Sequence, residues 1–214
     1  KKYPRNIKKD AKLLNGLCDF IFVPDAGQMY GADFCSSVEV KGLSDRLCGL
    51  SRKGHFAGVT TVISKLFNIV LPDRAYFGQK DAQQAAVIKK MVRDLDFGIG
   101  IKTLPIVREP DGLAMSSRNT YLSEKERKEA TVLYQAIKSA ERMAAMGQAD
   151  AQKIQGALID FIGKTGSARI DYVEIVDPVS FLPVKFIKKE ALLLLAVFIG
   201  KTRLIDNTIL KVKS

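Results

Sequence analysis

Two short stretches of this chain carry side chains suited to binding phosphate. Residues 78–81 read "GQKD", and residues 115–118 read "MSSR". A lysine supplies a point charge for phosphate oxygens, and an arginine forks onto two of them, while serine hydroxyls and backbone amides take others. An aspartate accepts hydrogen bonds from ribose hydroxyls. Both stretches are therefore candidate sites for a phosphorylated small molecule.

Each stretch also has a purely structural interpretation. Asp81 and Gln84 are spaced as the N-cap and N3 residues of a helix, and Lys80 can be a solvated surface lysine. "GQKD" is not the Gly-x-x-x-x-Gly-Lys-Ser/Thr loop that cradles phosphates. Ser116 and Ser117 can bond to their own backbone in a turn. The residue types alone leave both interpretations open.

Alternating helix and strand patterns must position these residues. Apolar spacing at i, i+3, i+4 and i+7 predicts helices through residues 59–66 and 88–95, and we interpret "DRAYF" (73–77) as a buried strand and "GIKTLPIV" (100–107) as another strand. This order is what a crossover in a parallel sheet produces. The "GQKD" segment directly follows the first of these strands. It then lies at the carboxyl edge, where open α/β sheets bind ligands.

The remaining patterns complete an α/β protein. An exposed helix ends at Gly16, and a short strand is expected at residues 19–23. Ser123 and Glu126 form a capping box that opens a long helix with Ala130, Leu133, Ile137 and Ala140 facing inward.

A further helix is expected from Asp150 to the glycines Gly163 and Gly166, followed by strands in residues 168–177 and 190–200. The last strand is so apolar that both of its faces should be covered. The character of the chain changes after Pro105, which predicts a domain boundary between residues 1–106 and 107–214.

Composition limits the class of protein. The chain of 214 residues is 47% hydrophobic and 27% charged, enough to bury a core. The longest apolar run, at residues 191–199, is shorter than the roughly 20 residues that span a bilayer. No signal peptide opens the sequence, so we expect a soluble, cytoplasmic protein.

The thiols, the histidine and the charge narrow the chemistry. Three cysteines (Cys18, Cys35 and Cys48) without a C-x-x-C pattern favour reduced thiols, and one histidine, His55, excludes a His–His metal centre. The net charge of +11 favours anionic partners. The basic N-terminal cluster has only Tyr3 for stacking on bases, which disfavours nucleic acid. Its members are Lys1, Lys2, Arg5, Lys8, Lys9 and Lys12.

Three longer segments resemble the pantothenate synthetase family, ligases that join pantoate to β-alanine. They are residues 51–95 ("SRKGHF…VRDL"), residues 105–123 ("PIVREPDGLAMSSRNTYLS") and residues 200–207 ("GKTRLIDN"), and the resemblance covers essentially the whole chain. It implies an α/β fold: a Rossmann-like parallel-sheet nucleotide-binding domain, N-terminally incomplete in residues 1–106, and a smaller α/β domain in residues 107–214.

The resemblance also implies roles for individual residues. Gly78, Gln79, Lys80 and Asp81 match the segment that binds ATP, with the lysine near the phosphates and the aspartate at the ribose. Gln84 matches a glutamine that binds pantoate, and Val107 matches a position whose backbone contacts adenine. Met115, Ser116, Ser117 and Arg118 match the loop that holds the triphosphate, and Arg52 and His55 lie near the active site in a supporting role.

The implied reaction resembles amino-acid activation. Pantoate's carboxylate attacks the α-phosphorus of ATP in the presence of Mg²⁺, and the amine of β-alanine then displaces AMP from pantoyl adenylate. Catalysis would come from alignment and charge neutralisation by Lys80, Ser116, Ser117 and Arg118. The family is typically homodimeric.

The sequence begins inside the family's pattern. The first strand and a His-x-Gly-His loop normally precede "KKYPRN", and one histidine cannot supply that loop. We therefore expect little or no ligase activity from these 214 residues alone, and self-association through exposed apolar edges. The alternative is a non-catalytic remnant or oligomerising module with a nucleotide half-site, in which Lys80→Ala and Arg118→Ala would not change ATP binding.

Overall fold

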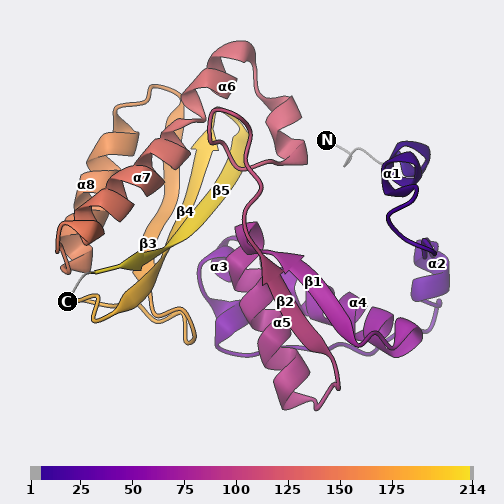
Figure 1. Cartoon of the computed structure of the whole chain (residues 1–214). Coiled ribbons are helices and arrows are strands. Elements are labelled where there is room, and N and C mark those ends of the chain that lie inside the picture. Colours follow the sequence, from indigo (N-terminus) through magenta and orange to yellow (C-terminus); the bar gives the residue numbers. More distant parts are fainter. Residues whose placement is uncertain (1–5, 213–214) are drawn as a thin grey trace. The chain divides into compact units, whose positions relative to one another are not determined.

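The computed structural model describes residues 6–212, so Lys1, Lys2 and Arg5 of the predicted basic cluster, and Tyr3 beside them, lie outside the described residues. The chain forms two compact units, residues 1–36 and residues 37–214. Figure 1 labels the elements of both units. The boundary predicted at residue 106 falls inside the second unit and stays a prediction.

The described part of the first unit, residues 6–36, contains two short helices. Helix α1 (Ile7–Leu14) starts at Asn6, whose side chain accepts a hydrogen bond from the Lys9 amide at 3.0 Å, and α2 covers Ala26–Met29. The strand predicted at residues 19–23 is wrong, because this segment is irregular and pairs with no strand among residues 6–212. Apolar residues alone do not make a strand, since its backbone needs a partner for the ladder. Phe20 is 93% exposed.

The second unit begins with the predicted helix–strand–helix–strand order. After η1 (Leu43–Asp45) and α3 (Cys48–Ser51) come α4 (His55–Val70), β1 (Arg74–Gly78), α5 (Ala82–Asp94) and β2 (Gly100–Leu104). Strands β1 and β2 are parallel, in register from Arg74↔Gly100 to Gly78↔Leu104. The parallel pair joined through α5 confirms the α/β prediction. The buried faces of α4 and α5 share one core, formed by Phe56, Phe67, Val87, Ile88, Met91 and Val92 together with Val40.

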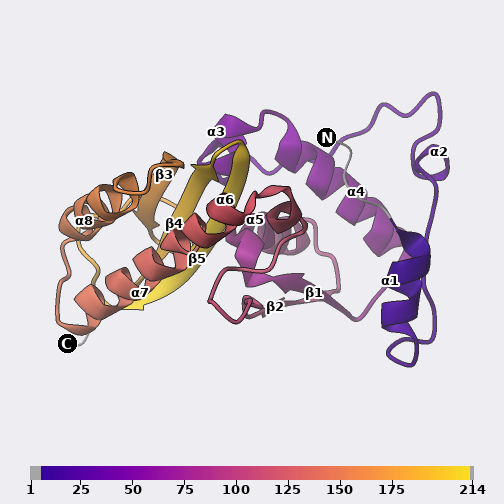
Figure 2. The same ribbon diagram turned by 90° about the horizontal axis from the view of Figure 1, so that it is seen from above.

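The C-terminal half of this unit is an antiparallel sheet covered by helices. Helices α6 (Glu124–Glu129), α7 (Val132–Ala145) and α8 (Ala151–Gly163) precede β3 (Ala168–Val176), β4 (Glu190–Ile199) and β5 (Thr202–Lys211). The strand order is β3–β4–β5. Figures 1 and 2 show α7 and α8 side by side along one face of this sheet, with α8 against β3 and α7 against β5.

Strand β4 is covered on both faces, as its apolar sequence predicts. Leu193, Leu195 and Val197 join the core formed with α7 and α8. Leu192 and Leu194, which point the other way because side chains alternate along a strand, pack with Ala82 of α5 and Phe181. The second face of β4 therefore lies against the start of α5 and the segment around Phe181.

The capping box at Ser123 is confirmed. The Ser123 amide donates to Glu126 Oε2 at 2.8 Å, and the Glu126 amide donates to Ser123 Oγ at 3.3 Å. The single long helix predicted from this point is wrong, because α6 ends at Glu129 and α7 begins at Val132. Thr131 Oγ1 donates to the Lys128 carbonyl at 2.8 Å, a local bond that competes with the helical ladder. The predicted inward residues Ala130, Leu133, Ile137 and Ala140 are all buried.

Two further expectations concern the thiols and the membrane. Cys18, Cys35 and Cys48 are free thiols, as predicted. Across residues 6–212, no helix is both long and apolar enough to span a bilayer. Strand β5 is the one regular element of the C-terminal sheet that the sequence patterns do not predict.

Candidate active site

The "GQKD" segment forms a tight turn between β1 and α5. Gly78 ends β1, and the 3-10 turn η2 (Gln79–Asp81) leads directly into α5. Asp81 stands at the N-cap of α5, but its side chain makes no capping hydrogen bond. Asp81 therefore occupies the predicted N-cap position without capping the helix through its side chain, and its exposed carboxylate can accept hydrogen bonds from a ligand.

Lys80 belongs to a group of interacting charges. Burial of its ammonium lowers the pKa of Lys80, and the nearby guanidinium of Arg118 lowers it further, while Asp81 and Asp206 oppose the shift. The structure thus brings the "GQKD" and "MSSR" segments, far apart in sequence, within electrostatic range. Two cations this close repel each other, and a bound polyanion would relieve that repulsion.

Arg52 and His55 join the same group of charges. Arg52 Nη1 lies 2.9 Å from His55 Nε2. Burial lowers the pKa of both side chains, and the charge of Arg118 lowers both further, whereas Asp81 acts to raise them. With a pKa below its usual 6.5, the imidazole of His55 is neutral at neutral pH.

The "MSSR" segment combines a turn with an exposed guanidinium. Ser116 is the N-cap of the 3-10 turn η3 (Ser117–Tyr121), and its Oγ accepts from the Arg118 amide at 3.2 Å. Arg118 is exposed, and its Nη1 donates to the carbonyl of Arg203 on β5 at 3.2 Å. Ser116 therefore bonds to its local backbone, as the turn interpretation predicts. This turn leaves the Arg118 guanidinium exposed, so the turn and an anion site are compatible.

A tight hairpin leads into this turn. The Met115 amide donates to the Val107 carbonyl at 2.9 Å, so these two predicted site residues lie side by side at its open end. Gly112 sits near its tip with φ of +90°, and a Cβ there would lie 1.9 Å from the ring of Tyr134 on α7. The hairpin needs glycine at this position for both reasons.

Strand β5 fastens both segments through buried polar side chains. Asn207 Nδ2 donates to the carbonyls of Gln79 and Lys80 at 2.9 and 3.0 Å, and Gln79 Nε2 donates to Asn207 Oδ1 at 3.0 Å. Asp206 accepts from Arg108 Nη1 at 2.7 Å and from Nη2 at 3.0 Å. Arg108 Nη1 also donates to the Gly112 carbonyl at 2.9 Å, which ties the hairpin to the same strand.

A second polar cluster surrounds Arg203. Its Nε and Nη2 donate to Asp171 Oδ2 at 3.0 and 2.8 Å, and Nη2 also lies 3.5 Å from Cys48 Sγ. The thiol of Cys48 is 3.1 Å from the Tyr172 hydroxyl. Burial acts to lower the pKa of Arg203, but the hydrogen bonds to Cys48 and Asp171 raise it overall. These contacts hold in place the β5 residue whose carbonyl binds Arg118.

Sequence reasoning missed Arg108, Arg203, Asp206 and Asn207 as site residues. Three of them belong to the "GKTRLIDN" segment, which carried part of the family resemblance without a role of its own. A usable signal was present: two polar residues, Asp206 and Asn207, interrupt an otherwise apolar stretch of strand. Buried polar groups in such a place need dedicated partners.

The two glutamines at the start of α5 differ in environment. Gln83 is buried, donates to the Leu43 and Arg46 carbonyls at 2.8 and 2.7 Å, and accepts from the Cys48 amide at 3.1 Å. Gln84, the predicted pantoate ligand, is only half-buried. Gln83 thus has a structural role, and Gln84 is the one accessible to solvent.

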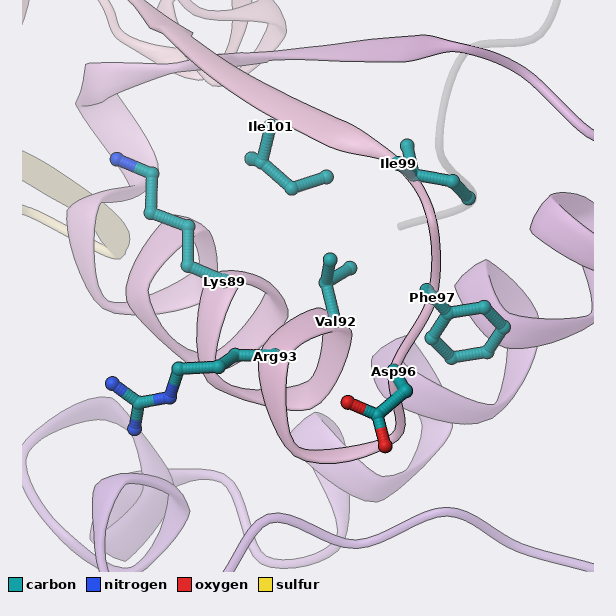
Figure 3. Close-up of a pocket in the computed structure, with 7 residues that line it drawn as sticks. All are labelled: Lys89, Val92, Arg93, Asp96, Phe97, Ile99 and Ile101. Atoms are coloured by element: carbon teal, nitrogen blue, oxygen red, sulfur yellow. The ribbon is translucent and has the colours of Figure 1, made fainter.

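Two hollows lie in the second unit, one beside the charged group and one away from it. One, of 240 Å³, has Arg52, Lys53 and Gly54 in its lining and so adjoins the charged group. The other, of 500 Å³, lies between α5 and β2, where Val92 points from the helix toward Ile99 and Ile101 (Figure 3). It sits at the C-terminal end of α5, roughly 18 Å along the helix from the Lys80 turn, and contains none of the predicted site residues.

No cluster of three or more His, Cys, Asp or Glu side chains suited to a metal is found within residues 6–212. The groups gathered at Lys80 are mainly cationic, and Asp206 is engaged by Arg108. This donor set suits phosphate oxygens better than a bare metal ion. A divalent cation fits it when carried on the phosphates of a nucleotide.

Known proteins resemble this chain along its whole length. The sequence model of the family described as "Pantoate-beta-alanine ligase" matches residues 1–209. A protein of Thermotoga neapolitana named pantothenate synthetase is 52% identical over 210 residues, which cover 98% of this chain and 75% of that protein. A protein of the same name from Caldicellulosiruptor bescii is 52% identical over 214 residues, covering 99% of this chain and 76% of the other.

Solved structures agree with these sequence matches. A crystal structure of pantothenate synthetase from Thermus thermophilus superposes with a TM-score of 0.93 at 41% identity, covering 97% of this chain and 75% of that one. The pantoate-beta-alanine ligase of Francisella tularensis, complexed with beta-gamma ATP and beta-alanine, superposes with a TM-score of 0.75 at 29% identity, covering 97% and 71%.

Proposed function

The chain belongs to the pantoate–β-alanine ligase family, and we propose that it condenses pantoate with β-alanine at the expense of ATP, through a pantoyl adenylate, with release of AMP and pyrophosphate. The observation that carries this proposal is the group of interacting charges at Lys80, Asp81 and Arg118. A triphosphate would neutralise the two cations, and the neighbouring carboxylate would accept from the ribose.

Lys80 and Arg118 bind the phosphates in this proposal. Arg118 supplies a planar fork and Lys80 a partly buried point charge, which attracts phosphate more strongly than an exposed lysine does. The Ser116 hydroxyl accepts from the Arg118 amide and still has its own hydrogen to donate to an oxygen. Ser117 and the backbone of Met115 complete the loop, in line with the family resemblance.

The nucleoside end of ATP lies along the "GQKD" turn and the start of the hairpin. Asp81 is exposed at the N-terminal end of α5 and accepts from the ribose. Gly78 lets the ligand approach the backbone closely, and Gln79 fixes the turn through Asn207. The backbone at Val107 contacts the adenine, beside the Met115 strand of the hairpin.

Pantoate binds at Gln84, in the first turn of α5 and close in sequence to Lys80. Its carboxylate oxygen attacks the α-phosphorus, the bond to the bridging oxygen breaks, and pyrophosphate leaves. The β-alanine amine next attacks the acyl carbon, loses a proton and displaces AMP. The protein's contribution is to align the reactants and offset phosphate charge, which Lys80, Ser116, Ser117 and Arg118 are suited to do.

Three accompanying features remain proposals. Mg²⁺ enters as the MgATP complex, held by phosphates and water, which requires few protein carboxylates. A homodimer is a prediction from the family resemblance, and a cytoplasmic location is a prediction from the composition and patterns of the sequence. Light scattering measures the oligomeric state, and imaging of a tagged chain shows its cellular location.

The test is AMP release that depends on both pantoate and β-alanine, measured in a chain extended at its N-terminus by the family's first strand and His-x-Gly-His loop, because we expect little or no ligase activity from the 214 residues alone. Lys80→Ala and Arg118→Ala should weaken ATP binding in a calorimetric titration, because each removes a phosphate ligand. Lys89→Ala, an exposed lysine further along α5, is the matched control and should bind ATP like the wild type. AMP release that does not depend on pantoate or on β-alanine would contradict the proposal. So would equal ATP affinity of the wild type and the Lys80→Ala, Arg118→Ala and Lys89→Ala variants.

A further inference from the structure

Asn207 is an unusual residue for its place in the fold. It lies in the middle of β5, paired with Leu194 of β4, and is only 2% exposed. Asparagine is disfavoured in strands, and burial of a carboxamide costs free energy unless its hydrogen bonds are made. The hydrogen bonds of this carboxamide therefore indicate what the residue is for.

All of these side-chain bonds go to one short turn. Both Nδ2 hydrogens are used, on the carbonyls of Gln79 and Lys80 at 2.9 and 3.0 Å, and Oδ1 accepts from Gln79 Nε2 at 3.0 Å. No other polar side chain is as fully committed to the Lys80 turn within residues 6–212.

The two carbonyls lie on either side of Lys80. The Gln79 carbonyl belongs to the peptide plane before Lys80, and the Lys80 carbonyl to the plane after it. Because peptide units are planar, hydrogen bonds to both carbonyls restrain the two planes and hence the backbone dihedrals of Lys80. Asn207 therefore restrains the direction of the Cα–Cβ bond from which the Lys80 side chain leaves the turn.

The same strand holds the opposing segment. The Arg203 carbonyl on β5 accepts from Arg118 Nη1 at 3.2 Å, and Asp206 binds the Arg108 guanidinium at the base of the hairpin. The Lys80 turn and the Arg118 side chain are thus both bonded to one strand, although their segments are remote in sequence.

We propose that Asn207 is a positioning residue for ATP binding: by holding the two peptide planes around Lys80, it fixes the backbone from which the Lys80 side chain reaches the phosphates. The inference rests on the proposed function, since it assumes that Lys80 and Arg118 share a triphosphate. Asn207 itself does not touch the nucleotide in this proposal.

The test compares Asn207→Ala with Thr208→Ala in the full chain. Thr208 is the next residue of β5, and its hydroxyl donates to Glu141 on α7 at 2.8 Å, so this control perturbs the same strand away from the Lys80 turn. We expect Asn207→Ala to bind ATP about tenfold more weakly at neutral pH. Thr208→Ala should stay within about twofold of the wild type.

The pH dependence of ATP affinity separates positioning from mere support of the fold. In the wild type, affinity should fall on the alkaline side as Lys80 loses its proton. The charged groups facing Lys80 are Asp81 on its own turn, Arg118 on η3 and Asp206 on β5. Releasing the turn exposes Lys80 to water, so Asn207→Ala should move this alkaline loss to higher pH, while Thr208→Ala should leave it unchanged.

The outcomes distinguish three cases: Asn207 positions Lys80, Asn207 only supports the fold, or the chain does not bind ATP. An unshifted pH profile in a folded Asn207→Ala protein would overturn the inference. If Asn207→Ala does not fold, Asn207→Ser, which keeps one donor, takes its place; failure of both while Thr208→Ala folds would make the role structural and also overturn it. If the wild type itself does not bind ATP, the proposed function fails instead.

Discussion

The buried pair formed by Arg108 and Asp206 gives a sharp prediction about stability. Arg108 Nη1 and Nη2 donate to the two carboxylate oxygens at 2.7 and 3.0 Å, and the two side chains are 23% and 1% exposed. Arg108→Met keeps an apolar stem against the Tyr134 ring, over which the guanidinium lies at 4.8 Å, but removes the charge. Asp206 then retains the hydrogen bond from the Asn207 amide, at 2.8 Å.

The magnitude follows from the burial of the carboxylate. Removing one partner of a buried pair costs about 3–5 kcal/mol, because the remaining charge stays in a medium of low polarity. Since Arg108 is partly exposed, water can reach the vacated position, and we expect the lower end, about 3 kcal/mol. The double variant Arg108→Met/Asp206→Asn removes the stranded charge and should recover at least half of that loss.

Urea unfolding followed by far-UV circular dichroism measures these free energies, since the chain has no tryptophan to report by fluorescence. The wild type, both single variants and the double variant complete a double-mutant cycle. A loss below about 1 kcal/mol for Arg108→Met, as for a surface pair, would refute the reasoning. So would a double variant no more stable than Arg108→Met alone.

Three further predictions concern Lys80, Gly112 and Ser123. ATP affinity should fall as the pH rises through the pKa of Lys80, which lies below the usual 10.5, because only the charged ammonium attracts phosphate. Lys80→Met should bind ATP about tenfold more weakly at neutral pH and show no such alkaline loss, as calorimetric titration can establish. Gly112→Ala should destabilise the protein by about 2 kcal/mol or more in urea unfolding, because its Cβ meets Tyr134 and its φ is positive. Adding Tyr134→Ala to Gly112→Ala should recover only the part of the lost free energy of unfolding that is due to the clash with the ring. Recovery of the whole loss would contradict a cost from the positive φ. Ser123→Ala should cost about 1 kcal/mol and speed amide exchange in α6, whereas Ser123→Asp should preserve the cap to Glu126; equal exchange in the two variants would argue against the capping box.

Local patterns in the sequence account for much of the fold. Apolar spacing located α4 and α5, the Ser123–Glu126 box located the start of α6, and the uninterrupted apolar run located β4 and its double burial. Each signal involves residues a few positions apart. A helix face or a cap is complete within such a window, so it can be read without knowing the rest of the structure.

The failures have an equally physical cause. Residues 19–23 look like a strand, but pairing requires a neighbour that the pattern does not specify. Strand β5 escaped prediction because Arg203, Asp206 and Asn207 break its apolar alternation. Those polar residues become intelligible only through partners such as Asp171, Arg108 and Gln79, which lie far away in the chain.

By itself, the sequence determined which residue types could bind a phosphorylated ligand: a lysine and an aspartate after one strand, and two serines and an arginine after a turn. It left open whether these were caps and turns or ligands. The tertiary structure decided that the Asp81 side chain makes no capping hydrogen bond, that the Ser116 side chain makes one, and that Lys80 and Arg118 lie within range of each other's charge. The reason is that β5 brings them together through long-range hydrogen bonds, and such bonds leave no periodic trace in the sequence.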